Sequence, residues 1–289
     1  MLTPLFRAFA RLPLRINHWI GAALGWIAYF ADRRYARTLC ANLAQSGIAR
    51  DHAEFTSLLR QNIAESGKAM TELFIAFLRP QGEVTALVSD CQGWGHVEAA
   101  LAKGRGVIFI TPHLGCFDIA GRYLANRIPI TFLYSPPKLR WAADVMYQGR
   151  VRGRATLAPA DMRGVRSMLK TLRARGNICI LPDQAPRHAD GVWVDFFGRP
   201  AFTMTLVGRL QHATNAEVVL FYGERLKHGQ GYRVCIDPLP QPLSPDNAAA
   251  ARQINAAIEG LVRRCPAQYY WSYNRYKVPA GAPPRPENT

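Results

Sequence analysis

Two side chains suited to proton transfer, His113 and Asp118, stand five positions apart in the segment TPHLGCFD. The apolar run 106–111 before them predicts a buried strand, and the residues after Asp118 have helical character. Because active sites of α/β sheets lie outside the carboxyl ends of strands, we expect His113 at such an edge. Side chains five apart do not share a helix face, so the two can meet only if the chain turns between them, which Gly115 permits.

This pair has the chemistry of direct acyl transfer. Asp118 would accept the imidazole N–H of His113, fix its tautomer and stabilise the imidazolium that forms. His113 would take the proton of an acceptor hydroxyl while that oxygen attacks a thioester carbonyl, so no covalent enzyme intermediate is needed. Cys116 is the competing nucleophile, but its apolar neighbours and the lack of a second base disfavour it. A structural, hydrogen-bonded histidine is the remaining alternative, and the position after a strand favours the general base.

Short apolar runs alternate with helical stretches along the rest of the chain and predict the fold that carries this pair. The runs are 106–111, 129–134, 177–182 and 216–222, and the helical stretches are 48–80, 118–126, 141–152, 164–175, 204–213 and 246–264. Nearly continuous apolar strands indicate burial on both faces. We expect a single α/β domain, residues 36–278, with a mostly parallel or mixed sheet covered by helices, and a flexible tail rich in Pro and Gly, residues 279–289.

The first 35 residues, 1–35, are expected to form a helical segment that associates with a membrane. Residues 17–30 are uncharged, and their flanks carry Arg11, Arg15, Arg33 and Arg34. The run is shorter than the ~20 residues that span a bilayer. Its tryptophan and tyrosine side chains favour the water–lipid boundary, and its arginines favour anionic headgroups. We therefore favour a shallow anchor over a span, and an ordinary buried helix of the domain is the alternative.

The chain has 36 Lys and Arg and 20 Asp and Glu, which give a net charge of +16. Such a positive charge indicates an anionic partner. A nucleic-acid-binding protein is disfavoured because the sequence has no zinc-ligand spacing and no RNP-like aromatic motif. Ten basic residues fall between Lys138 and Arg175, and one side of a predicted helix there carries Arg163, Arg166, Lys170 and Arg173. That face suits an acidic carrier protein or phosphate groups, or is a solvated surface.

The cysteines are scattered and show no CxxC spacing; they are Cys40, Cys91, Cys116, Cys179, Cys235 and Cys265. Several of them lie in apolar runs. We therefore expect buried free thiols in a reducing compartment, with no metal site and no cofactor.

Several motifs together resemble one known family. The segment HLGCFD resembles the HxxxxD/E motif of the lysophospholipid acyltransferase-like superfamily, and in particular that of the bacterial lipid A biosynthesis (lauroyl or myristoyl) acyltransferases. Further segments similar to that family follow in the same order: RVRGR at 150–154, LPDQ at 181–184, DFFG at 195–198 and PAQYYWSYNRYK at 266–277. The NLA at 42–44 and the amino-terminal segment are also similar, so the resemblance covers nearly the whole chain.

This resemblance implies an enzyme on the cytoplasmic face of the inner membrane, in contact with the lipids of that membrane. It implies that acyl carrier protein donates the acyl chain and that the acceptor is a phosphorylated disaccharide lipid, a precursor of lipid A. It assigns His113 and Asp118 as the catalytic pair and Arg150 as the group that steadies the oxyanion or an acceptor phosphate. Arg152 and Arg154 are equally close in sequence and remain alternatives that would bind substrate.

Three further residues are candidates for binding substrate. Asp183 and Gln184 follow a predicted strand and would shape the site, or else are structural caps. Phe197 would line an acyl pocket together with Phe196, or else belongs to the core.

The sequence also departs from the family pattern. Asp118 stands where Glu is common, Asp195 where Pro is common and Asn274 where His is common. The reaction class is unaffected, but these departures leave the acyl chain length and the acceptor hydroxyl open. A lysophospholipid or glycerophospholipid acyltransferase that uses a carrier or CoA donor is therefore the alternative function.

Overall fold

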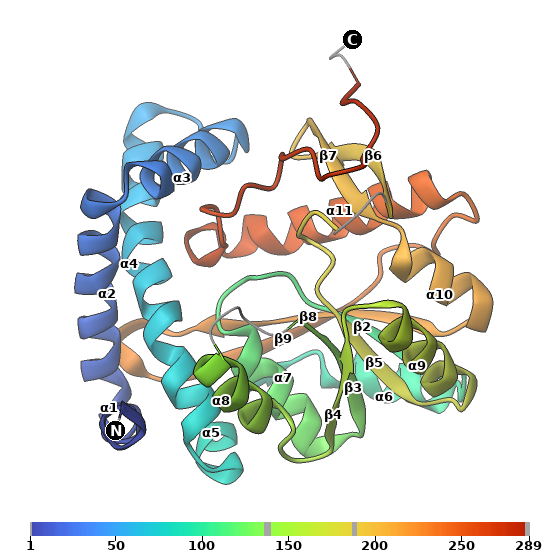
Figure 1. Cartoon of the computed structure of the whole chain (residues 1–289), viewed down its shortest axis with the longest axis horizontal. Helices are drawn as coiled ribbons and strands as arrows, with labels where there is room; N and C mark the ends of the chain where they lie inside the picture. Colours follow the sequence, from blue (N-terminus) through green and yellow to red (C-terminus); the bar gives the residue numbers. More distant parts are fainter. Residues whose placement is uncertain (1, 136–139, 187–189, 287–289) are drawn as a thin grey trace.

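The computed structural model describes residues 2–135, 140–186 and 190–286 (Figure 1). Its helices are α1 (Leu2–Ala10), α2 (Leu14–Ala31), α3 (Arg33–Gln45), α4 (His52–Leu78), α5 (Gln81–Ala86), α6 (Trp94–Ala102), α7 (Phe117–Arg127), α8 (Arg140–Arg150), α9 (Met162–Arg173), α10 (Leu206–Thr214) and α11 (Asn247–Arg264), with short 3-10 turns η1 (Lys227–Gly229) and η2 (Pro266–Gln268). Its strands are β1 (Val88–Gln92), β2 (Val107–Ile110), β3 (Ile130–Tyr134), β4 (Ala155–Pro159), β5 (Asn177–Ile180), β6 (Gly191–Phe196), β7 (Arg199–Met204), β8 (Glu217–Arg225) and β9 (Tyr232–Pro238).

The main sheet is mixed, as the sequence predicts. Among the described residues it has seven strands in the order β1-β9-β8-β2-β5-β3-β4. Its neighbouring strands run parallel except β8 and β9, which form an antiparallel pair. Strands β6 and β7 form a separate antiparallel hairpin. The four predicted strands correspond to β2, β3, β5 and β8, whereas β1, β4, β9 and the hairpin were not predicted.

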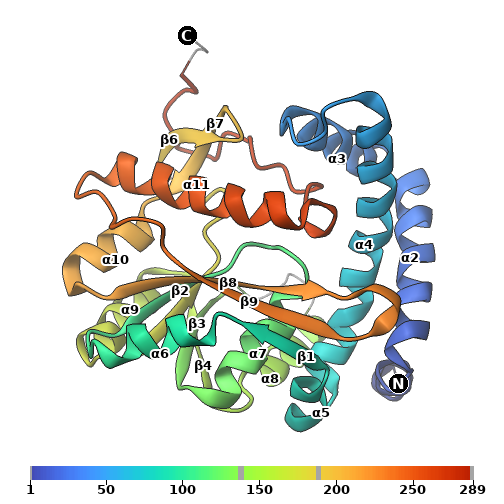
Figure 2. The same cartoon turned by 180° about the vertical axis from the view of Figure 1, so that it is seen from behind.

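Helices cover both faces of the sheet, which explains the continuous apolar strands. In β2, Ile108 and Ile110 pack into a core with α9, α10 and α11. Val107 and Phe109 alternate with them and pack on the other face with α6 and α7. Figures 1 and 2 show α11 and α7 on opposite sides of the sheet. Because every side chain of β2 is buried, the strand's carboxyl end and the loop after it are fixed firmly.

The amino-terminal helices pack against the rest of the fold through glycines. Helices α2 and α4 lie side by side in both views (Figures 1 and 2). At their contact, a Cβ on Gly67 would lie 2.0 Å from the carbonyl oxygen of Gly21, and a Cβ on Gly25 would lie 2.2 Å from that of Ile63. Side chains at these positions would therefore force the two backbones apart.

A buried cluster of charges joins these helices to the sheet. Glu72 of α4 is fully buried, and its carboxylate accepts hydrogen bonds from Arg225 of β8 and from the Tyr232 hydroxyl of β9, the latter at 2.7 Å. His18 of α2 lies 2.6 Å from the same carboxylate. Burial disfavours the ionised acid, but the charges and hydrogen bonds of Arg225 and His18 lower the pKa of Glu72 to about 2.

The face of α2 turned away from α4 is apolar and exposed. The relative exposure of Trp19 and of Phe30 is 74%, and the same helix exposes Ile16, Leu24 and Ile27. Within the described ranges, no helix is long and apolar enough to cross a membrane. The amino-terminal segment therefore has an inner face that packs on the fold and an outer face of exposed apolar side chains.

Candidate active site

His113 lies in the loop between β2 and α7, the connection that the sequence predicts. Gly115 makes the turn with a φ of 60°, and a Cβ there would lie 1.9 Å from the carbonyl oxygen of Gly223. The loop is tied down by backbone hydrogen bonds: Gly115 N–H donates to Gln268 at 3.0 Å, and Cys116 N–H donates to Gly223 at 2.7 Å. Glycine is therefore required at position 115 both by its left-handed backbone and by the close approach of β8.

A buried carboxylate holds the imidazole of His113, and it belongs to Asp183. Nδ1 of His113 lies 2.8 Å from Oδ1 of Asp183, and the backbone N–H of His113 donates to Oδ2 at 2.9 Å. Asp183 follows β5 and is 2% exposed. Since the carboxylate accepts the Nδ1 proton, Nε2 keeps its lone pair and can accept a proton. Nε2 lies 3.2 Å from the side-chain amide nitrogen of Gln184.

The ionisation of Asp183 suits this role. Burial by itself raises the pKa of Asp183, but the charge of His113, its two hydrogen bonds and the charge of Arg275 outweigh that effect. The pKa of Asp183 therefore lies below its ordinary value, and the carboxylate is anionic at neutral pH. A fixed anion behind the ring stabilises the imidazolium that proton transfer would create.

Asp118 does not contact the imidazole of His113, contrary to the prediction from the sequence. Asp118 lies in the first turn of α7, as expected, but its Oδ1 accepts hydrogen bonds from Arg150, with Nε and Nη2 both at 2.8 Å. Both ring nitrogens of His113 have other partners. The turn at Gly115 carries Asp118 toward α8, so Asp183 holds the imidazole and Asp118 holds Arg150. Oδ2 of Asp118 is buried and has no hydrogen-bond partner among the described residues.

Among the three candidate arginines, Arg150 is the one beside Asp118. Its guanidinium lies 5.4 Å from the ring centres of Phe77 and Tyr134, which further fixes its position. Arg152 instead donates to the backbone carbonyl of Arg79, and Arg154 donates to that of Arg127 at 3.2 Å. Their roles as substrate ligands remain predictions.

The structure places Phe197 at the turn between β6 and β7 and buries it in the core. It packs against Phe196 and Trp271, with ring centres 4.8 Å and 5.4 Å apart. Its contacts are those of a core aromatic residue. Binding of an acyl chain by Phe197 remains a prediction.

Residues 266–277, the carboxyl-terminal motif, also contact the His113 loop. The sequence did not predict this contact. The backbone N–H of Tyr270 donates to the carbonyl of His113 at 3.1 Å, and the two rings lie 6.2 Å apart. Asn62 of α4 donates to the carbonyls of Ala267 and Tyr269, both at 2.8 Å. Asn42 of α3 donates to the carbonyls of Trp271 and Tyr273. The signal was present only as the similar segments NLA and PAQYYWSYNRYK, whose spacing gives no hint that they meet.

Cys116 has the environment of a structural thiol. Burial, followed by the negative charge of Glu72, raises the pKa of Cys116 well above its usual value. A protonated, buried thiol is a poor nucleophile. All six cysteines lie within the described residues and are free, but the prediction of buried thiols holds for four of them, because Cys40 and Cys91 are half-buried.

His113, at the edge of a mixed α/β sheet and backed by a buried carboxylate, has the arrangement that proton transfer to and from a substrate requires. The family model of bacterial lipid A biosynthesis acyltransferases matches residues 3–278. The chain is 25% identical to the lipid A biosynthesis lauroyltransferase of Escherichia coli K12, over 95% of this chain and 90% of that protein. It is also 25% identical to the lipid A biosynthesis myristoyltransferase of the same organism, over 91% and 81%.

A relative named phosphatidylinositol mannoside acyltransferase, from Mycobacterium tuberculosis, is 28% identical over 62% of this chain and 57% of that protein. The match to the family model covers nearly the whole chain. The chain therefore belongs to the bacterial lipid A biosynthesis acyltransferase family.

Proposed function

We propose that this protein transfers a fatty acyl group from acyl carrier protein to a hydroxyl of a lipid A precursor, on the cytoplasmic face of the inner membrane. The observation that carries the proposal is the arrangement of His113, whose Nδ1 lies 2.8 Å from the buried carboxylate of Asp183, so that Nε2 is the nitrogen left to accept a proton. Family membership supplies the substrate class.

The proposed reaction uses His113 first as a base and then as an acid. Nε2 takes the proton of the acceptor hydroxyl as its oxygen attacks the thioester carbonyl, which gives a tetrahedral oxyanion. The oxyanion collapses, the carbon–sulfur bond breaks, and the imidazolium returns the proton to the leaving thiolate. Gln184 contacts Nε2, so the acceptor hydroxyl would replace that contact.

In this proposal Asp118 acts through Arg150. A guanidinium held by two nitrogens against one carboxylate oxygen is fixed in place and can stabilise the oxyanion or an acceptor phosphate.

Membrane association is part of the proposal. The exposed apolar side chains of α2 would enter the lipid–water boundary, and the arginines at 11, 15, 33 and 34 would meet anionic headgroups. In this scheme residues 1–35 are the anchor, 36–278 the acyltransferase domain and 279–289 the tail.

The acceptor assay tests the function directly. Full-length protein is given acylated carrier protein with a lipid A precursor in one arm and with lysophosphatidic acid in the other. We expect transfer to the lipid A precursor, and mass spectrometry of the product identifies the acyl chain and the hydroxyl. Exclusive transfer to lysophosphatidic acid would contradict the proposed acceptor, and a preference for acyl-CoA would contradict the proposed donor.

A further inference from the structure

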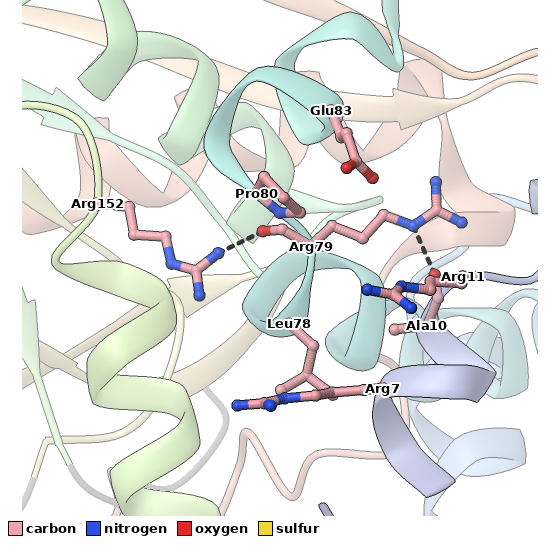
Figure 3. Close-up of a pocket in the computed structure, with 8 residues that line it drawn as sticks. All are labelled: Arg7, Ala10, Arg11, Leu78, Arg79, Pro80, Glu83 and Arg152. Carbon is pink, nitrogen blue, oxygen red and sulfur yellow. Dashed lines mark hydrogen bonds between the residues drawn. The ribbon is translucent and has the colours of Figure 1, made fainter. Parts of the chain in front are cut away.

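A cavity of about 270 Å³ lies where α1, the end of α4 and the segment after α8 meet (Figure 3). Four arginines line it, together with one acidic residue, Glu83; they are Arg7, Arg11, Arg79 and Arg152. Within the described part of the chain, no ion pair is found between Glu83 and any of these arginines. Four positive charges and one negative charge therefore line the cavity, which leaves an excess of positive charge.

Two of these arginines are held in place by backbone carbonyls. Nε of Arg79 donates to Ala10 at 2.5 Å, and its Nη2 donates to Leu12 at 2.6 Å. Arg152 donates to the carbonyl of Arg79, as Figure 3 shows, and through Nε to that of Gln148 at 3.3 Å. Carbonyls orient the guanidinium groups but do not neutralise them, so the groups stay available to an anion.

The surroundings of the cavity add to the positive potential. Arg122 of α7 donates to the carbonyls of Ala76 and Arg79, beside the cavity wall. Burial, followed by the positive charge of Arg152, lowers the pKa of Arg122 to about 10. A bound anion would relieve this repulsion between like charges.

The position and the walls of the cavity indicate a lipid. Leu78 and Ala10 contribute apolar surface beside the arginines. Leu5, on the same helix as Arg7, is 65% exposed and lies in the segment proposed to meet the membrane. An anion that carries hydrocarbon fits this combination better than a free inorganic ion.

We propose that this arginine pocket binds the phosphate group of a membrane lipid. Two lipids supply that chemistry: the phosphorylated acceptor itself, which rests on the proposed function, and an anionic phospholipid of the surrounding bilayer, which does not.

The first experiment measures binding without catalysis. Full-length protein in neutral detergent is titrated with dihexanoyl phosphatidic acid, with dihexanoylglycerol as the probe that lacks phosphate. Arg7 and Arg11 are exposed, so the double variant R7Q/R11Q should fold. We expect it to bind the phosphatidic acid at least about tenfold more weakly than the wild type, and we expect no binding of dihexanoylglycerol by either protein.

The matched control removes the same charge outside the pocket. R37Q/R60Q alters two exposed arginines, one in α3 and one in α4, that do not line the cavity, and it should bind the phosphatidic acid within about twofold of the wild type. Wild-type binding by R7Q/R11Q, or an equal loss in R37Q/R60Q, would overturn the proposal.

A second experiment identifies the lipid. If the acceptor occupies the pocket, R7Q/R11Q raises KM for the phosphorylated acceptor in neutral micelles and leaves kcat unchanged. If bulk phospholipid occupies it, KM is unchanged and partition onto phosphatidylglycerol vesicles falls. The titration with phosphatidic acid needs no turnover, so an inactive protein would refute the proposed function and leave the pocket proposal intact.

Discussion

His113 and Asp183 have separate tasks, so their replacements should have separate effects on the reaction. His113→Ala removes the base and should lower kcat by about 10²–10⁴-fold. Asp183→Asn keeps a hydrogen-bond partner for Nδ1 but removes the anion behind the ring, and it should lower kcat by a smaller factor of at least about tenfold. Steady-state acyl transfer with a lipid A precursor measures both.

Asp90→Asn is a suitable control for these variants, because that carboxylate forms a partly exposed ion pair with Arg233. It should leave kcat unchanged. Turnover by His113→Ala within tenfold of the wild type would be incompatible with general-base catalysis by this residue.

Asp118 and Arg150 form one unit, which predicts a non-additive effect. Asp118→Asn should release Arg150, and Arg150→Ala should remove the cation, so each should lower kcat at least about tenfold. Because the two act together, the double variant should be little worse than Arg150→Ala alone. If the loss of kcat in the double variant equalled the product of the two single losses, the two residues would act independently.

At the scale of single residues, the sequence could predict His113 and not its partner. The position of His113 depends on a local pattern, a buried strand followed by a glycine turn. The bond between His113 and Asp183 joins residues 70 positions apart, and such a contact exists only once β2 and β5 pair. Asp118 was the nearest carboxylate along the chain, and the turn that was expected to bring it to the imidazole carries it to Arg150 instead.

At the scale of elements, the close contact between α2 and α4 predicts that a side chain at position 67 destabilises the protein. Gly67→Ala places a methyl group against the backbone of α2 and should lower the free energy of unfolding by about 1–3 kcal/mol. Gly260→Ala is the matched control, since a Cβ there meets nothing within 4 Å in α11. Alanine favours a helix over glycine by about 0.5–1 kcal/mol, so the control should be neutral or stabilising.

Chemical denaturation of both variants at one pH provides the comparison. Equal changes in the two proteins would mean that the close approach of α2 and α4 contributes nothing to stability.

Two of the strands that the sequence predicted, β2 and β5, are buried on both faces, although burial alone is not decisive, since β9 is also largely buried and was not predicted. Strands β2 and β5 are buried at every position, so their apolar runs are unbroken and easy to recognise. Strands β1 and β4 have exposed positions and lie at the edges of the sheet, where composition resembles that of loops. The long helix α4 was predicted because its apolar spacing continues to Pro80.

In the whole molecule, the buried cluster around Glu72 predicts a loss of stability in acid. The pKa of Glu72 is lowered to about 2, so its stabilising contribution is complete above pH ~4.5 and is lost as the pH falls toward 2. That contribution is on the order of 3 kcal/mol. The free energy of unfolding, measured from pH 7 down to pH 3, should fall in this range.

Glu72→Gln should make the same pH profile flatter. It should also destabilise the protein at pH 7 by about 3–5 kcal/mol, because Arg225 would then be buried without its main counter-ion. An unchanged slope below pH 4.5 would show that other carboxylates dominate acid unfolding.

The exposed face of α2 predicts membrane binding by the intact molecule. Deleting the helix would uncover Gly67 and Glu72, so substitutions are the sharper test. The triple change Trp19→Ser, Ile27→Ser and Phe30→Ser should lower partition onto vesicles at least about tenfold, since each apolar side chain contributes about 1.5–3 kcal/mol when buried. Met162→Ser with Val278→Ser, which alters exposed apolar residues outside α2, should not change partition in a sedimentation assay.

The hydrogen bonds between the His113 loop and residues 268 and 270 have a consequence for synthesis on the ribosome. Chains are made from the amino terminus, so residues 268–270 leave the ribosome long after α2 and the His113 loop. A nascent polypeptide that already exposes α2 would then reach the bilayer before its histidine loop is secured. Activity would begin only after residues 268–270 have been made, and fragments that stop before residue 268 would be inactive even where they attach to lipid.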